Sequence, residues 1–169
     1  MKLNPQVVEA LNKQINNELH ASYTYLAMSA YFEAQDLPGF ASWFRGHSAE
    51  EDTHAMRIFD FIAKRGARIN LDGIAKPQTE YESPVDVLEQ ALAQEQTVTA
   101  QINALFELAH EVKEYSTQNM LNWFLAEQIE EEDLFTSILD KAKAASGDRW
   151  NLLLLDQELA KRGGGQSEA

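Results

Sequence analysis

The sequence contains no cysteine among its 169 residues. This absence excludes disulfide frameworks, zinc sites built on thiolates, iron–sulfur clusters and thiol nucleophiles. Any metal in this chain must therefore be held by oxygen and imidazole nitrogen. Glycine and proline are also scarce, at 8 and 4 residues, while 44% of residues are hydrophobic, which argues against disorder or a fibrous repeat. The length and composition predict a single domain over residues 1–169.

Basic residues and long apolar runs are missing as well. The chain has 14 Lys and Arg against 27 Asp and Glu, which gives a formal net charge of −13 at pH 7. Such a surface repels a phosphate backbone, so nucleic acid is not expected as a partner. No stretch approaches the roughly 18 apolar residues of a membrane span, and the first residues form no signal-peptide core. We therefore expect no membrane association and a cytoplasmic location.

The apolar residues recur at the spacing of helices, and no segment alternates as a strand would. Asn4 before Pro5 and Ser83 before Pro84 fit helix N-caps followed by proline at the first helical position. Gly147 fits a helix C-terminus. The sequence predicts four long helices and one short helix, over about residues 5–34, 38–65, 84–113, 117–145 and 149–162.

The connection between the second and third predicted helices is long. Loops in simple up-down bundles take about 2 to 8 residues, whereas this segment covers residues 66–82. At about 3.3 Å per residue it can span a helix of about 42 Å, so the second and third helices can run parallel. The predicted fold class is therefore all-α: a four-helix bundle with one long crossover and a short C-terminal fifth helix.

The fifth helix is apolar around most of its circumference, because it contains Trp150 and the run Leu152–Leu155. A lone short helix cannot bury such a surface. Packing on its own bundle is one explanation, and burial between subunits is the other. We favour burial between subunits, since the chain is otherwise acidic and hydrophilic.

Each long predicted helix carries an acidic residue inside its apolar stripe: Glu18, Glu51 with His54, Glu95 and Glu131. At about 1.5 Å per residue, each glutamate lies about 17 to 21 Å from its helix start, so all lie near mid-length. Burying uncompensated carboxylates is costly, and the fourth helix has no Lys or Arg before Lys141. Four carboxylates and one imidazole are hard ligands that suit iron or manganese. For any single glutamate, an exposed rim position stays the alternative.

Other polar and aromatic residues near these stripes are less informative. Three histidines, His20, His47 and His110, are interpreted as surface residues or as neighbours of metal ligands. Tyr25 and Trp123 fit either plain core aromatics or redox-active side chains.

These motifs resemble the ferritin family, and specifically its non-haem bacterial members, across nearly the whole chain. The matching stretches, taken together, are specific to that family. They are Asn17–Tyr25, Glu50–His54, Glu95, Asn122–Phe124 and Glu127–Glu132.

The resemblance implies a ferroxidase centre in each subunit, at which Fe²⁺ is oxidised by O₂ or H₂O₂. One iron is held by Glu18 and His54, the other by Glu95 and Glu131, and Glu51 bridges the two. The product is Fe³⁺ stored as a mineral inside a shell of 24 identical subunits, with the fifth helix at its four-fold axes.

The resemblance also implies roles for residues around this pair of irons. They are Gln128 beside the second iron, Tyr25 and Trp123 as sources of electrons, and Glu50, Glu127 and Glu130 as ligands of a third iron.

Two departures narrow the resemblance. Bacterioferritins have Glu and His at the positions of Gln128 and Glu131 in this chain. They also bind haem through a Met, and this chain has Asp52 at that position. The resemblance therefore implies no haem. In animal ferritins carboxylates line the three-fold pores, but the aligned positions are Gln118 and Leu121. The resemblance therefore does not extend to that route of iron uptake.

Two other classes of protein stay open on the sequence alone. One is a di-iron peroxidase or oxygen scavenger of the rubrerythrin type, although the absence of cysteine removes its usual rubredoxin module. The other is a non-catalytic helical assembly subunit whose acidic stripe is structural. A twelve-subunit mini-ferritin is a related alternative, but it lacks the last helix.

Overall fold

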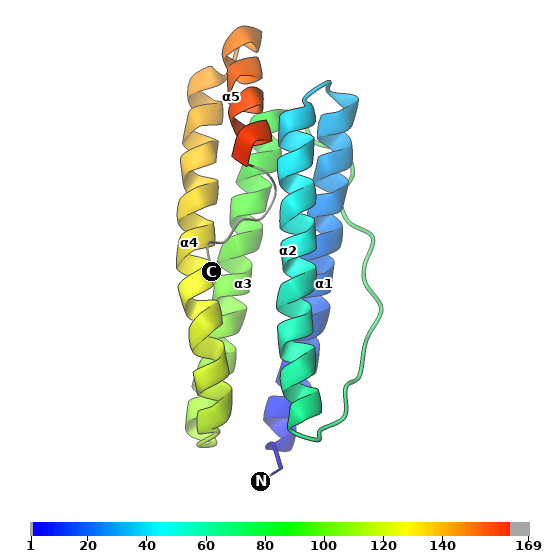
Figure 1. The fold of residues 1–169 in the computed structure, drawn as a ribbon, viewed down its shortest axis with the longest axis vertical. Coiled ribbons are helices and arrows are strands. Elements are labelled where there is room, and N and C mark those ends of the chain that lie inside the picture. The colour runs from blue at the N-terminus through cyan, green and yellow to red at the C-terminus, as the bar shows by residue number, and fades with distance from the viewer. Residues whose placement is uncertain (1, 163–169) are drawn as a thin grey trace.

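The computed structural model describes residues 2–162, and within that range it contains five helices and no strand (Figure 1). The predicted domain also includes residue 1 and residues 163–169, which lie outside the described part. The all-α fold class is confirmed. The helices are α1 (Pro5–Ala34), α2 (Pro38–Lys64), α3 (Pro84–Glu111), α4 (Tyr115–Ala145) and α5 (Arg149–Arg162).

The helix starts follow from local chemistry. The Asn4 side chain accepts a hydrogen bond from the backbone N–H of Gln6, and the Ser83 side chain accepts one from Asp86, so both predicted N-caps are present. The fourth helix begins two residues before the predicted start at residue 117, because the chain reverses earlier. Lys113 has a φ of 60° at the end of α3, and α4 already begins at Tyr115.

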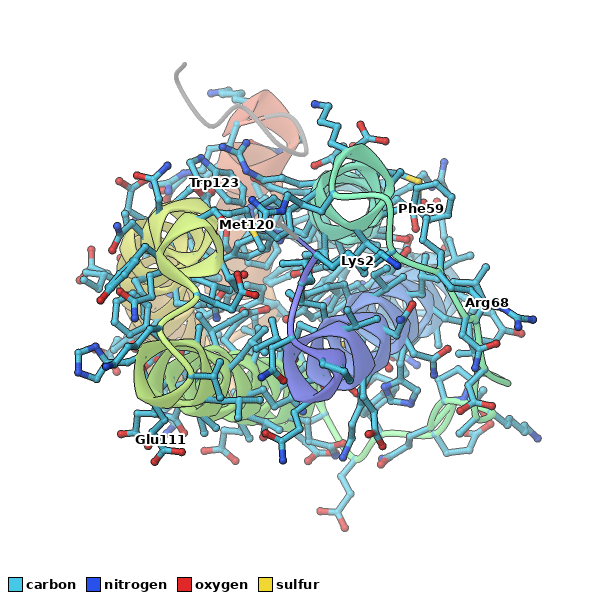
Figure 2. The ribbon with its side chains drawn as sticks, turned by 90° about the horizontal axis from the view of Figure 1, so that it is seen from below. Lys2, Phe59, Arg68, Glu111, Met120 and Trp123 are labelled. Atoms are coloured by element: carbon cyan, nitrogen blue, oxygen red, sulfur yellow. The ribbon has the colours of Figure 1, made fainter. Side chains whose placement is uncertain are left out.

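The long crossover runs along the side of the bundle from the end of α2 to the start of α3, so that these two helices point in the same direction (Figure 1). This arrangement confirms the predicted topology. Tyr81 anchors the crossover near its end, since its ring packs 5.4 Å from that of Tyr31 on α1. Viewed along the bundle, α1 to α4 surround an interior filled with side chains (Figure 2).

A polar layer divides the hydrophobic core into two parts. One cluster, near α5, contains Tyr25, Phe44, Ala91 and Phe135, and the other, near the N-terminus, contains Ile15, Ala55, Val98 and Phe124. On each of the four long helices, the residues between these two clusters include buried acidic groups. The layer therefore lies between two rigid apolar blocks that fix the helices on either side of it.

α5 packs on its own bundle through Leu155 and Leu159, both buried. The other face is exposed, with Trp150 at 69% and Leu154 at 48% of their full accessibility. One face of α5 therefore has a partner within the chain, and the burial of α5 between subunits stays a prediction. Within residues 2–162, no helix combines the length and the apolar character needed to cross a bilayer.

Asp156 of α5 docks this helix onto the start of α2. Leu37, at the N-cap of α2, offers no side-chain acceptor, and the Oδ1 atom of Asp156 instead accepts the backbone N–H of Phe40 at 2.9 Å. A Cβ atom at Gly39 would lie 1.8 Å from the backbone oxygen of Asp156, so only glycine permits this approach.

We predict that Gly39→Ala displaces α5 and lowers the free energy of unfolding by at least about 1–3 kcal/mol, the range for overpacked sites. Urea unfolding followed by circular dichroism measures this loss. Gly73→Ala is the matched control, since a Cβ atom there meets nothing within 4 Å. Equal stability of the two variants would contradict the docking role of Gly39.

Candidate metal centre

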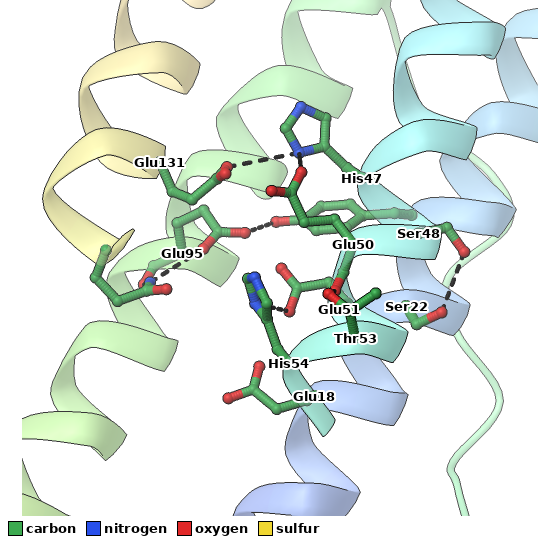
Figure 3. Close-up of polar contacts among 12 residues, drawn as sticks. Glu18, Ser22, His47, Ser48, Glu50, Glu51, Thr53, His54, Glu95 and Glu131 are labelled. Carbon is green, nitrogen blue, oxygen red and sulfur yellow. Dashed lines mark hydrogen bonds and ion pairs between the residues drawn. The ribbon is translucent and has the colours of Figure 1, made fainter. Parts of the chain in front are cut away.

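The polar layer gathers acidic residues from all four long helices. Glu18 comes from α1, Glu51 and His54 from one face of α2, Glu95 from α3 and Glu131 from α4 (Figure 3). All five residues are buried, and none exceeds 5% exposure. The three-residue step between Glu51 and His54 places both on the same side of α2.

Glu18, Glu51 and His54 form one group of possible ligands. One ligand atom of each lies within 4.8 Å of the others, and the Nδ1 atom of His54 is 3.1 Å from Oε2 of Glu51. Gln14 donates to Oε1 of Glu18 at 2.9 Å. The other oxygen of Glu18 and the Nε2 atom of His54 are buried without a hydrogen-bond partner. A cation between these atoms would satisfy both.

Glu95 is held by two donors. The Tyr25 hydroxyl donates to Oε1 of Glu95, and the Nε2 atom of Gln128 donates to Oε2 at 3.1 Å and to the backbone oxygen at 3.2 Å. Both Tyr25 and Gln128 are buried. The two side chains thus fix the plane of the Glu95 carboxylate inside the layer.

His47 borders the layer on the side of the hydrophobic cluster near α5, where its ring lies 5.0 Å from that of Phe135. Its Nδ1 atom lies 3.5 Å from Oε2 of Glu131 and 3.7 Å from Oε2 of Glu50, and the three residues form a second group able to hold a cation. The sequence interpretation left open whether His47 lies at the surface or beside the ligands, and the structure buries it. Its position four residues before Glu51 on the α2 stripe was the available signal.

A third group joins Glu50, His54 and Glu127, again with ligand atoms within 4.8 Å. Two of the three residues expected at an additional iron site, Glu50 and Glu127, thus lie together. Glu130 is exposed and belongs to none of the three groups found in the described residues.

The two aromatic residues singled out by the sequence both touch the layer. Tyr25 stacks on Phe135 with 5.7 Å between ring centroids and donates to Glu95. Trp123 meets the His54 ring edge-on at 5.2 Å, and the Arg57 guanidinium lies 4.0 Å from the centroid of the indole. Trp123 therefore connects the layer with the surface of α2.

Burial dominates the electrostatics of the site. Desolvation, followed by the charge of Glu51, raises the pKa of Glu18 well above its ordinary value of 4.5. Burial and neighbouring carboxylates likewise raise the pKa of Glu51, and they raise the pKa of Glu131 to about 10. Burial also lowers the pKa of His47 to about 4. Without metal, the layer therefore keeps protons on its glutamates.

The carboxylates of the layer lack basic partners. Among residues 2–162, the ion pairs seen for these groups are those with His47 and His54. A cluster of acids without Lys or Arg can bind cations in exchange for protons. The arrangement suits one or more divalent cations with oxygen and imidazole ligands.

Comparison with known proteins identifies the family. Residues 8–145 match the family model for a ferritin-like domain. The chain belongs to the ferritin family. It is 39% identical to the bacterial non-heme ferritin of Staphylococcus saprophyticus over 166 residues, which cover 98% of this chain and 99% of the relative. The corresponding protein of Staphylococcus haemolyticus is also 39% identical, over 160 residues.

Solved ferritin structures share the fold. An open pore ferritin from the archaeon Archaeoglobus fulgidus superposes with a TM-score of 0.93 at 40% identity, covering 94% of this chain and 98% of the other. A structure described as a humanized archaeal ferritin covers 98% of this chain and all of its own, at 42% identity and a TM-score of 0.95. The resemblance inferred from the motifs, and the ferritin-like bundle it implied, are confirmed.

We predict that the metal-free protein loses stability as pH rises from about 6 to 9. The pKa of Glu131 is about 10 when folded and ordinarily 4.5, so its stabilising contribution is complete below 4.5 and is lost as pH rises toward 10. The slope is about 1.4 kcal/mol per pH unit for each proton retained by the folded state. Denaturant unfolding in the presence of a chelator measures it.

Glu131→Gln is the control, because an amide cannot titrate. Its stability is expected to fall less steeply over the same interval. A wild-type free energy of unfolding that does not fall between pH 6 and 9 would contradict the retention of protons by the glutamates of the folded protein.

Proposed function

We propose that this protein is a ferroxidase and iron store, which oxidises Fe²⁺ with O₂ or H₂O₂ and keeps Fe³⁺ as a mineral inside a cytoplasmic cage of 24 subunits. Membership of the ferritin family supports iron storage. The observation that carries the ferroxidase proposal is the buried layer of carboxylates. Groups of possible ligand atoms come from α1, α2 and α4, and Glu95 of α3 is buried in the same layer. Three of the proposed ligands, Glu18, His54 and Glu131, each have a buried atom without a hydrogen-bond partner.

The proposed ligands divide between two iron ions. Glu18 and His54 bind the first ion, Glu95 and Glu131 bind the second, and Glu51 bridges them. The close approach of Glu18, Glu51 and His54 supports the first half of this assignment. Carboxylates can change between terminal and bridging modes, and their negative charge favours Fe³⁺ over Fe²⁺. The same side chains can thus accept the substrate and stabilise its oxidised form.

The reaction balances within one site. Two Fe²⁺ ions give up one electron each, and O₂ takes up these two electrons with two protons to become H₂O₂. When H₂O₂ is the oxidant, two electrons and two protons convert it to two water molecules. The protons that the glutamates release when Fe²⁺ binds lie where the oxidant is reduced.

The residues around the pair take supporting roles in this proposal. Gln128 lies beside the second iron, and Tyr25 and Trp123 supply electrons when the oxidant needs more than two. Glu50, Glu127 and Glu130 bind a third iron, and this third site lies on a path away from the two-iron site. The proximity of Glu50 and Glu127 to His54 supports this path, and the exposure of Glu130 is consistent with its outer end.

We predict that Glu51→Ala lowers the rate of ferrous oxidation by at least about 100-fold, because loss of a ligand exceeds the 10- to 100-fold effects of outer residues. Stopped-flow absorbance after addition of two Fe²⁺ per subunit measures the ferric product. Asp52→Ala, at the exposed adjacent position, is the matched control. An unchanged rate in Glu51→Ala would overturn the assignment. A wild type without a rapid phase would favour a non-catalytic assembly subunit.

We also predict that the protein elutes as a cage. With 24 copies of a 19.1 kDa chain, closed symmetry gives a mass of about 460 kDa. The exposed face of α5, with Trp150 and Leu154, provides apolar surface for such contacts. Size exclusion with light scattering tests this mass. A monomer or dimer would contradict the cage and favour a scavenging enzyme of the rubrerythrin type.

A further inference from the structure

A chain of hydrogen bonds leads from the surface to Glu95 along the seam between α3 and α4. The Thr99 hydroxyl donates to Oε1 of Glu132 at 2.5 Å, and the Nε2 atom of Gln128 lies 3.3 Å from Oγ1 of Thr99. The same Nε2 atom donates to Glu95. Thr99 and Glu132 are half-buried and line a surface pocket of about 350 Å³.

The hydrogen atoms of this chain can be assigned by chemistry. A hydroxyl has one hydrogen, and Thr99 gives it to Glu132, whose ionised carboxylate can only accept. Thr99 can then only accept from Gln128. The backbone oxygen of Glu95 is also only an acceptor, so both neighbours require the NH₂ group of the Gln128 amide on this side.

The orientation of this amide matters for a cation. An amide binds a metal ion through its oxygen, whereas its NH₂ group carries positive partial charge and repels one. When Glu95 binds a metal through Oε2, its hydrogen bond to Gln128 weakens. The hydrogen bond from Nε2 of Gln128 to Thr99 then helps to prevent a half-turn flip of the Gln128 amide.

We propose that Thr99 and Glu132 are positioning residues that orient the Gln128 amide, with Nε2 toward Glu95 and Oε1 available to the metal. This inference rests on the proposed metal site at Glu95 and Glu131. Glu132 acts by fixing the hydroxyl hydrogen of Thr99, and Thr99 acts by accepting from Gln128. Neither residue touches the metal itself.

Thr99→Val tests the proposal, because valine has the shape of threonine but no hydroxyl. Calorimetric titration of the wild type with Zn²⁺, a redox-inert probe, is expected to show two ions bound per subunit. In Thr99→Val the affinity for one of them is expected to fall about 10- to 100-fold, the usual effect of losing a partner of a metal ligand. Thr99→Ser, which keeps the hydroxyl, is expected to restore it.

A spectroscopic measurement separates this role from a purely structural one. Visible absorption of bound Co²⁺ reports its ligand geometry, so Thr99→Val is expected to change the spectrum and Thr99→Ser to preserve it. Thr97→Val is the matched control, since the exposed Thr97 hydroxyl bonds only to the backbone oxygen of Ala93 in the described structure.

Glu132→Gln provides a second, independent variant. A glutamine can donate to Thr99 and so free the hydroxyl hydrogen to turn toward Gln128, which permits the reversed amide. A smaller loss of affinity than in Thr99→Val is expected. Asp133→Asn removes the same charge from the exposed neighbouring position and is expected to bind as the wild type does.

The outcomes distinguish this inference from the function on which it rests. A wild type that binds no pair of Zn²⁺ ions would overturn the proposed metal centre itself. If the wild type binds two ions and Thr99→Val binds both with unchanged affinity and an unchanged Co²⁺ spectrum, the positioning role is wrong and the centre stands. If Thr99→Val lowers the affinity for both ions equally and also lowers the melting temperature of the protein, the positioning role is wrong as well.

Discussion

The energetic cost of burying carboxylates in the middle of a helical bundle is the constraint on which the rest of this structure depends. Glu18, Glu51, Glu95 and Glu131 are all at most 5% exposed, and their ion pairs in the described residues are with histidine alone. Removing such groups from water costs several kcal/mol each unless protons or cations neutralise them. Burial raises the pKa of all four carboxyl groups, which favours their protonated forms when no metal is bound.

The fold is arranged to keep this unfavourable layer in place. Apolar clusters above and below it pack tightly, with rings such as Phe32 and Phe40 stacked 4.6 Å apart. The crossover lets α2 and α3 run parallel, and Asp156 ties α5 to the start of α2. The stability of these outer parts offsets the cost of the centre, as is common where a binding site breaks the rules of core packing.

The helices and the buried acidic residues of the layer could be predicted from the sequence because both follow from local spacing. Glu18, Glu95 and Glu131 stand out as acids at apolar positions, and a step of three residues joins Glu51 to His54. Rise per residue then suffices to place them at one level. Spacing along single helices does not predict contacts that depend on how one helix is rotated against another.

Several features escaped sequence reasoning for that reason. The contact of His47 with Glu131 depends on the rotation of α2 against α4, and the bond between Thr99 and Glu132 depends on the register of α3 against α4. The start of α4 depends on Lys113, a residue with positive φ that composition does not flag. The role of Gly39 also depends on packing, because its lack of a side chain is what admits Asp156.

The most direct test of the account is anomalous diffraction from crystals soaked anaerobically in a ferrous salt. Two iron peaks are expected within the polar layer, one among Glu18, Glu51 and His54 and the other beside Glu95 and Glu131. A layer without iron, in which these carboxylates turn outward to solvent, would contradict the central claim that bound metal neutralises them.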